Sequence, residues 1–523
     1  MNNPLFRTLI IFGACIVLAV WLGFLLVGPL TYSSMAVYGA LAFILAFPLL
    51  LRWHYPLLLL SWYMTVSVFF LPGSPSIALL MIVLSLGISI LQRMISTQSQ
   101  FIHVPQITLP LLLMLGVIAV TAKLTGFGLR VFGSGIYGAA KYFYLVGGVL
   151  GYFALSAKKI PPERKNLYIG LFFLGGVVGI VGDFLPFLPR SLYFIYWVFK
   201  PNTNFLVSGR IDSGDTRLVG TWLMSMAVVS YMLARYGIRG MFLSGKPWRW
   251  ILFLLFAVAG MLGGFRGYVI LVGFNFMVQF FLEGLYRTKL MAVLVAGGIL
   301  GALAMIPLSD HLPDTIQRAL AFLPYKVDPE VRLEAQGSLD WRLDMWQAIL
   351  PQVPHYLLLG KGYVLSQRDF SFLVDPNGMF RNSAFAENDA LALSEDFHNG
   401  PLSVVIPFGI WGCLAFLWFL AAGTWVMYRN YRYSDPALQT VNTGLLAAFL
   451  TVTFFFLFVG GFFNNDMLKF CGLVGFSVAL NGGVRRRVRV VQPVRETPGP
   501  RSFAAMPGSP VPAFQRRQPG LGR

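Results

Sequence analysis

The sequence predicts an all-α polytopic membrane protein, with roughly 12–14 transmembrane helices and one large loop that contains short helices. The chain of 523 residues is 57% hydrophobic and 12% charged, roughly half the charge of a typical soluble protein. Apolar runs recur that can cross a hydrocarbon layer of roughly 30 Å, which takes about 20 helical residues. These runs are continuous rather than alternating, which indicates helices and not the strands of a membrane barrel.

Roughly fourteen runs are candidates for membrane spans. Two of them, 77–91 and 250–263, are short, so tilted, re-entrant or merged arrangements are alternatives to separate spans. The first run has no small-residue cleavage site after it, so we expect a retained helix rather than a signal peptide. The runs lie near residues 9–29, 34–51, 55–71, 77–91, 107–122, 137–155, 167–188, 218–234, 250–263, 267–283, 290–307, 401–428, 438–459 and 466–481.

The charges of the connecting loops predict the orientation of the chain, because cytoplasmic loops are enriched in Lys and Arg. The loops at 30–33, 72–76 and 460–465 contain neither residue. Every short loop on the opposite side contains at least one, which predicts that both termini are cytoplasmic. Those cations are Arg52, Arg93, Lys158, Lys159, Arg164, Lys165, Arg235, Arg239, Lys246, Arg249, Arg287, Lys289, Arg429, Arg432 and the tail that begins with Arg485.

The chain divides into four predicted parts. Residues 1–307 hold about eleven transmembrane helices, residues 308–400 form the large loop outside the cytoplasm, and residues 401–483 hold about three further helices. Residues 484–523 form a basic tail rich in Pro and Gly without apolar periodicity, for which we expect disorder.

The net charge of +19 comes largely from this tail and from the cytoplasmic loops. Basic juxtamembrane segments are attracted to anionic headgroups, so membrane lipids are expected partners. Nucleic-acid binding is not predicted, because no stacking platform or recognition motif accompanies the charge.

The cysteines and the short motifs predict neither a metal site nor a nucleotide site. Cys15, Cys413 and Cys471 fall inside predicted spans and lack ligand-like spacing. The chain has no G-x-x-x-x-G-K-[ST] phosphate loop. We therefore expect no metal, no cofactor and no ATP-driven transport by this chain alone.

The large loop is the most informative part of the sequence, because loops this long are usually functional. It contains thirteen of the chain's 21 acidic residues. Residues 338–350 predict an amphipathic helix, with Ser338 as N-cap and Asp340 in the first turn. We expect this helix at the membrane surface, with Trp346 at headgroup level. A flexible turn at residues 360–362 (Gly-Lys-Gly) follows.

Three motifs of the loop and of the span after it carry a family resemblance. They are R-x3-W at Arg342 and Trp346, G-x-G at 360–362, and His398-Asn399 at the foot of a helix with Gly-Ile-x-Gly at 409–412. In their order and spacing they resemble the bacterial O-antigen ligase and polymerase superfamily, in which a large periplasmic loop lies between late transmembrane helices.

Two earlier features fit the same resemblance, which covers roughly residues 205–425. Arg266-Gly267 matches an Arg-Gly pair that the family often has at the outer end of a span. The stretch SGRIDSGDTRLVG, with Arg210 and Arg217, matches an arginine-glycine stretch that opens a mid-chain helix. Relatives often have an Asn-Pro-Asn-like turn where this chain has Asp215-Thr216-Arg217, so Arg210 and Arg217 are both candidates for the family arginine.

The resemblance implies an inner-membrane glycosyltransferase of polysaccharide or lipopolysaccharide biosynthesis in the cell envelope. Its donor would be a glycan on undecaprenyl diphosphate, and its acceptor a hydroxyl at the periplasmic face. His398 would be the general base. Arg210, Arg217, Arg266 and Arg342 would stabilise the leaving diphosphate without a metal. The supporting candidates are Asn399, Lys141, Glu395 and Trp346.

Each candidate residue also has a structural interpretation. His398 could cap its helix or reach the interface, and Arg266 and Lys141 could extend their charges toward the headgroups. Arg342 could pair with a loop acid. Glu395, Asp396 or Glu387 could orient His398 or replace it as the base. Trp346 could anchor the loop rather than stack on a sugar.

Three functions are compatible with the sequence. The first is the glycosyltransferase, whose acceptor (lipid A core, another lipid-linked repeat or a protein) the shared motifs leave open. The second is a transporter or flippase of lipid-linked sugars, and the third is a non-enzymatic assembly scaffold. The spans hold few ionisable groups, such as Asp183 and Glu283 near span ends, whereas transporters carry polar groups at the midplane. The sequence therefore favours chemistry at the outer face.

Overall fold

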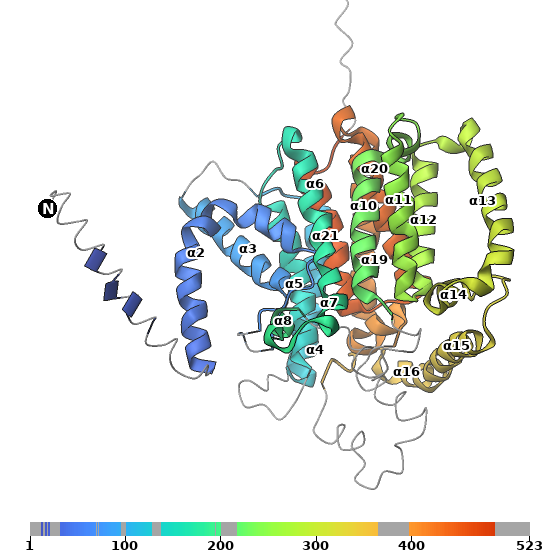
Figure 1. Ribbon diagram of the computed structural model, residues 1–523. Helices are drawn as coiled ribbons and strands as arrows, with labels where there is room; N and C mark the ends of the chain where they lie inside the picture. Colours follow the sequence, from blue (N-terminus) through green and yellow to red (C-terminus); the bar gives the residue numbers. More distant parts are fainter. Residues whose placement is uncertain are drawn as a thin grey trace, which may run out of the picture. The chain divides into compact units, whose positions relative to one another are not determined.

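A computed structural model describes residues 32–69, 71, 73–95, 101–127, 138–193, 195–199, 217–364 and 397–486, with a few isolated positions between 12 and 23 (Figure 1). Most of the first predicted span and of the basic tail lie outside these residues. In the described part the secondary structure is helical, with two isolated β-bridges and no strand. The predicted all-α fold class is confirmed.

The helices of the described part have these bounds: α2 Tyr32–Ser61, α3 Ile77–Ile95, α4 Pro105–Thr125, α5 Ala139–Ser156, α6 Lys165–Leu174, α7 Val181–Phe184, α8 Ile195–Val198, α10 Val219–Phe242, α11 Pro247–Ala259, α12 Arg266–Leu282, α13 Lys289–Leu308, α14 Asp314–Leu320, α15 Pro329–Ile349, α16 Val353–Tyr356, α19 Gly400–Tyr433, α20 Pro436–Phe458 and α21 Phe463–Asn481. The 3-10 turn Gly260–Gly263 joins α11 to α12.

Seven helical segments of the described residues are long and apolar enough to cross a membrane. Two shorter apolar segments, Pro247–Gly263 and Arg266–Leu282, accompany them. The chain is therefore a polytopic membrane protein, as predicted. The seven segments are Ile44–Ser61, Ile77–Ile95, Pro105–Thr125, Pro162–Phe184, Lys289–Leu308, Gly400–Tyr433 and Pro436–Phe458.

One pair of predicted spans was wrong in detail. Residues 34–51 and 55–61 lie in one helix, because α2 continues through Arg52 to Ser61, and the rest of the predicted span 55–71 is outside this helix. The polar residues that suggested a loop stay helical, since His54 is buried and its Nδ1 lies 2.8 Å from the Ser85 Oγ of α3.

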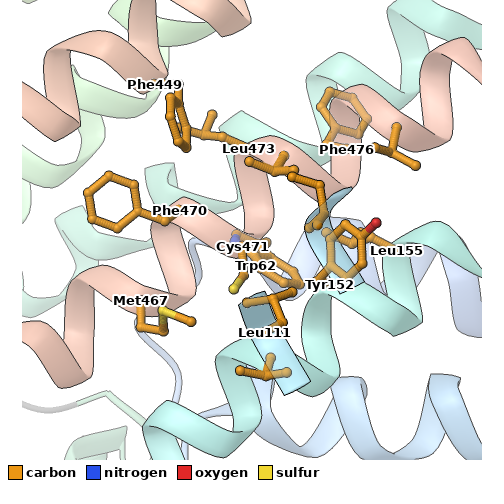
Figure 2. Close-up of a cluster of buried hydrophobic side chains, with 14 of the residues drawn as sticks. Trp62, Leu111, Tyr152, Leu155, Phe449, Met467, Phe470, Cys471, Leu473 and Phe476 are labelled. Atoms are coloured by element: carbon orange, nitrogen blue, oxygen red, sulfur yellow. The ribbon is translucent and has the colours of Figure 1, made fainter. Parts of the chain in front are cut away.

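The apolar core centres on α21, which packs against α5, α19 and α20. Figure 2 shows this cluster, where side chains of α21 meet Trp62, Leu111, Tyr152 and Phe449 from four other segments. These aromatic and aliphatic side chains are almost fully buried. Such burial fixes the place of α21, whose first turn reaches the candidate site described below.

The two acidic residues near span ends both bind the backbone of α10. The Asp183 carboxylate accepts hydrogen bonds from Gly220 N (2.8 Å) and Thr221 N (2.6 Å) at the start of the helix. The Glu283 carboxylate accepts from Ile238 N (2.8 Å) and Arg239 N (2.9 Å), just after the backbone leaves helical geometry at position 237. Both carboxylates thus satisfy backbone groups that a helix end or kink would otherwise leave unpaired.

The large loop contains α14, α15 and α16, which lie at one end of the helix bundle (Figure 1). Helix α15 begins at Pro329, nine residues before the predicted start at Ser338. Asp328 is the N-cap, because its Oδ1 accepts a hydrogen bond from Glu330 N at 2.8 Å, and a proline suits the first helical position. Ser338 was therefore wrongly predicted as the cap.

The glycines of the G-x-G motif (360–362) and of the Gly-Ile-x-Gly motif (409–412) lie where the loop contacts α19. The backbone of α19 breaks at Gly409, which has a positive φ of 61°. The backbone groups that lose their helical partners at this break bond to the loop instead. Lys361 N donates to Ile406 O (2.8 Å), and Ile410 N donates to Leu357 O (2.7 Å). A Cβ on Gly360 would lie 2.1 Å from Pro407 O. The predicted flexible turn is thus an ordered contact, which we call the glycine clamp (residues 357–362 against 406–410).

Candidate functional site

A cavity of about 1100 Å³ opens among the helices that carry the candidate residues. Its volume lies slightly above the range of about 300–1,000 Å³ that ligand pockets usually have. Arg217, Arg266, Arg342, Trp346 and His398 all line it. The structure therefore brings together five side chains that are separated by up to 181 positions in the sequence.

The cavity is also where the N-termini of four helices converge. Residues at or next to the starts of α10, α12, α19 and α21 line it. A helix N-terminus carries a partial positive charge of roughly half a unit. At three of these helix starts a side chain already accepts a backbone N–H: Asp183 at α10, Asn399 at α19 and Asp466 at α21. The start of α12 has no side-chain cap among the described residues, so this end is the one that favours an anion.

Arg266 and Arg342 form one cationic side of the cavity. Arg266 is the first residue of α12, and its Nη2 donates to Ala335 O of α15 at 2.9 Å. Burial, and then the charge of Arg266, lower the pKa of the half-buried Arg342 guanidinium. Both groups stay charged, since arginine does not deprotonate in proteins. Two close guanidinium groups repel each other and gain from an anion between them.

Two further observations extend this cationic side. Among the described residues, no hydrogen-bond partner is found for the buried Nε of Arg342. Arg217 lies against the turn before α12, because a Cβ on Gly264 would be 3.5 Å from Arg217 Cγ. The spacing of four residues between Arg342 and Trp346 places both on one face of α15, and both line the cavity.

His398 occupies a strained position just before α19. Its φ of 47° is positive, which only one other non-glycine residue of the described chain shows. Such a backbone persists only where its surroundings hold it, and functional sites are enriched in such residues. The ring packs edge-on against Phe462, with 4.7 Å between the ring centroids.

The capping role that His398 could have had is performed by its neighbour Asn399. The side chain of Asn399 caps α19 by accepting a hydrogen bond from Leu402 N at 3.1 Å. Trp346 Nε1 donates to Phe397 O at 2.7 Å, and Met345 and Ile349 of α15 pack in one apolar cluster with Phe397. Helix α15 is therefore fastened directly beside His398, which is not itself the cap.

The remaining predicted residues are placed elsewhere or are not described. Lys141 lies next to the glycine clamp, with its Nζ 5.3 Å from the centroid of the ring of Tyr363, the residue that follows the clamp. It is not among the residues that line the cavity. Arg210 and Glu395 lie outside the described residues, as do Glu387 and Asp396.

The sequence did not single out three charged residues of the cavity wall: Arg318 of α14, and Asp466 and Lys469 of α21. A signal for the last two existed, because an acid and a cation three residues apart open an otherwise apolar span. Among the described residues, no group of three or more His, Cys, Asp or Glu side chains could hold a metal ion.

The fold and this cavity define a membrane protein with a cationic site at one end of its helix bundle. Residues 251–417, which contain Arg266, Arg342 and His398, match the family model of the O-antigen ligase domain. The match at residues 251–417 supports the O-antigen ligase and polymerase superfamily, and the predicted resemblance is confirmed over this part of the chain. This family implies a glycosyltransferase-like enzyme. A search of curated proteins found no match.

Proposed function

We propose that this protein is an inner-membrane glycosyltransferase of the O-antigen ligase or polymerase type. It transfers a glycan from an undecaprenyl diphosphate carrier to an acceptor hydroxyl at the periplasmic face. The observation that carries the proposal is the single cavity in which Arg217, Arg266 and Arg342 meet His398 at four helix N-termini. The positive charges of the loops on the opposite side support a periplasmic site.

The reaction needs two things that this cavity offers. As the acceptor oxygen bonds to the anomeric carbon, the bond from that carbon to the phosphate oxygen breaks, and charge develops on the leaving diphosphate. Arg266 and Arg342 stabilise that charge with fixed donors in a partly buried site. His398 takes the proton of the acceptor hydroxyl as it attacks.

The inner part of the cavity suits the lipid portion of such a donor. Below the charged groups its wall is apolar and consists of α10, α12 and α20, with Met226, Val229, Leu271 and Val452 among the lining residues. A polyprenyl chain would bury hydrocarbon there while its diphosphate lies at the arginines. A cationic end joined to an apolar end is what a lipid-linked anion requires.

The same structure gives less support to a transporter. Proton-coupled transport uses intramembrane acids that are available to exchange protons or ions. Asp183 and Glu283 are instead bound to the α10 backbone by two or more hydrogen bonds each. We therefore rank translocation of lipid-linked sugars second, and a non-enzymatic scaffold third.

The test is complementation of a deletion strain with wild type, His398→Ala, Arg266→Ala or Arg266→Lys, with membrane expression checked. We expect both alanine variants to insert normally, accumulate the lipid-linked glycan and lose the product. The product of the wild type identifies the acceptor as lipid A core, another lipid-linked repeat or a protein. Full transfer by both alanine variants would refute the site and move the transporter and the scaffold ahead.

A further inference from the structure

Asp466 has no role in the reaction proposed above, yet it lines the same cavity. It lies in the first turn of α21 and is buried, with 7% of its surface exposed. Its Oδ2 accepts a hydrogen bond from Phe462 N at 2.9 Å, and its Oδ1 accepts one from Lys469 Nζ at 2.8 Å. Both carboxylate oxygens are thus engaged, one by the backbone before α21 and one by a cation.

The backbone that Asp466 holds is the support of His398. The turn Gly460–Phe462 joins α20 to α21, and the Phe462 ring packs edge-on against the His398 ring at 4.7 Å. The backbone of the turn is equally close, because a Cβ on Gly460 would lie 3.1 Å from His398 O. The strained φ of His398 therefore rests against a turn whose shape depends on one carboxylate.

The start of α19, next to His398, also packs closely against α20. A Cβ on Gly400 would lie 2.1 Å from Phe456 O, so only glycine allows this approach. Ser403 Oγ accepts a hydrogen bond from Phe463 N at 3.2 Å, which joins α19 to the start of α21. These contacts hold the start of α19 against α20 and against α21. Asp466 sets the conformation of the turn between α20 and α21.

We propose that Asp466 is a positioning residue, which holds the Gly460–Phe462 turn so that the Phe462 ring keeps His398 in its reactive orientation. This inference rests on the proposed function, since it assumes that His398 is the base. Asp466 would act through Phe462 and not by touching the substrate. Lys469, which is half-exposed at 49%, would keep the carboxylate in the rotamer that accepts the Phe462 N–H.

The experiment measures the transfer reaction of the purified full-length protein in detergent or liposomes, with the lipid-linked glycan as substrate. Asp466→Ala removes the acceptor of the Phe462 N–H, whereas Asp466→Asn keeps an oxygen for it and removes only the charge. Phe462→Leu keeps apolar bulk and removes the ring edge that meets His398. Asp435→Ala is the matched control, because Asp435 also precedes a helix and pairs with a cation, Arg485, at 3.1 Å.

We expect Asp466→Ala and Phe462→Leu to lower kcat about 10- to 100-fold, since misplacing a catalytic group by about 1 Å has effects of this size. The KM for the donor should stay within about twofold, because the arginines are untouched. Asp466→Asn should recover most of kcat. Asp435→Ala should match the wild type, and the thermal midpoint of each variant shows whether it is folded.

The outcomes separate this inference from the proposed function. If His398→Ala is inactive while Asp466→Ala and Phe462→Leu have wild-type kcat, the positioning role is refuted and the function stands. A raised KM with unchanged kcat would also refute it, because it would make Asp466 a substrate-binding residue. If His398→Ala is fully active, the proposed function itself fails. If Asp466→Ala does not fold, the positioning role is tested with Asp466→Asn and Phe462→Leu instead. A wild-type kcat in Phe462→Leu would then refute the positioning role.

Discussion

The cationic cavity and the glycine clamp carry residues of the same family-like motifs, yet they are built for different purposes. In the cavity, Arg266, Arg342 and His398 meet at helix N-termini and line an open volume. In the clamp, Gly360 and Gly409 have positive φ values and let the loop backbone contact the backbone of α19. The comparison teaches that residues of a family-like motif can either line the candidate site or join the backbone segments that hold the site in place.

His398→Ala should have the largest effect on turnover of any single change. Removing a general base costs about 10²- to 10⁴-fold in rate, and the donor should still bind because the arginines remain. The measurement is the initial rate of glycan transfer by the purified protein at saturating donor. His355→Ala is a matched control, since His355 lies in α16 and not among the cavity-lining residues. If His398→Ala transferred glycan near the wild-type rate, His398 would not be the general base, and the cavity would differ from the clamp in structure but not in this catalytic role.

Arg342→Gln should be the next largest effect. Removing one preorganised donor to developing charge costs about 10²- to 10³-fold in kcat, and Arg342→Lys should recover little because lysine lacks the bidentate geometry. Steady-state kinetics of the two variants check this. Equal, near-wild-type rates in both would show that Arg342 serves only the fold of the loop.

Gly360→Ala should damage folding rather than chemistry. Its φ of 73° and the approach to Pro407 O leave no room for a Cβ, and the strain would cost about 1–3 kcal/mol. We expect a lower thermal midpoint and less folded protein in the membrane, with the rate per folded molecule reduced far less than in His398→Ala. A full thermal midpoint together with abolished transfer would move the clamp into the catalytic site.

Lys141→Gln should have the smallest effect. Lys141 contacts the ring of Tyr363, the residue that follows the clamp, and cation–π contacts contribute about 0.5–1 kcal/mol at accessible sites. We expect transfer within about twofold of the wild type, measured beside Arg342→Gln in the same assay. A reduction as large as that of Arg342→Gln would place Lys141 in donor binding.

The helical membrane fold could be predicted from the sequence, because long apolar runs indicate membrane spans. The order of the motifs indicated where the large loop lies and which residues to consider for the site. The helix predicted around Arg342 and Trp346 is present as part of α15, where residues four apart share a face. The start of α15 was missed because Asp328-Pro329 is a stronger start signal than Ser338. The merging of two spans into α2 was missed because His54, which suggested a loop, is buried against Ser85 of α3, a tertiary contact that no local pattern encodes.

The missed site residues share a physical reason. Arg318 lies on a short helix whose place depends on the packing of α14 against α12 and α15, so its sequence neighbourhood says little about where its side chain lies. Asp466 and Lys469 were absorbed into a predicted span, although their pairing marks the outer end of α21. The convergence of four helix N-termini is a property of the packing and cannot be seen in any single segment.

The most direct test of the central claim is binding of undecaprenyl diphosphate, the carrier without its glycan, to three purified proteins. The account predicts that His398→Ala binds the carrier as the wild type does. The double variant Arg266→Gln/Arg342→Gln should bind it at least about tenfold more weakly, since a hydrogen bond to a charged group contributes about 1.5–3 kcal/mol. Wild-type affinity in the double variant would contradict the assignment of the cavity to the diphosphate.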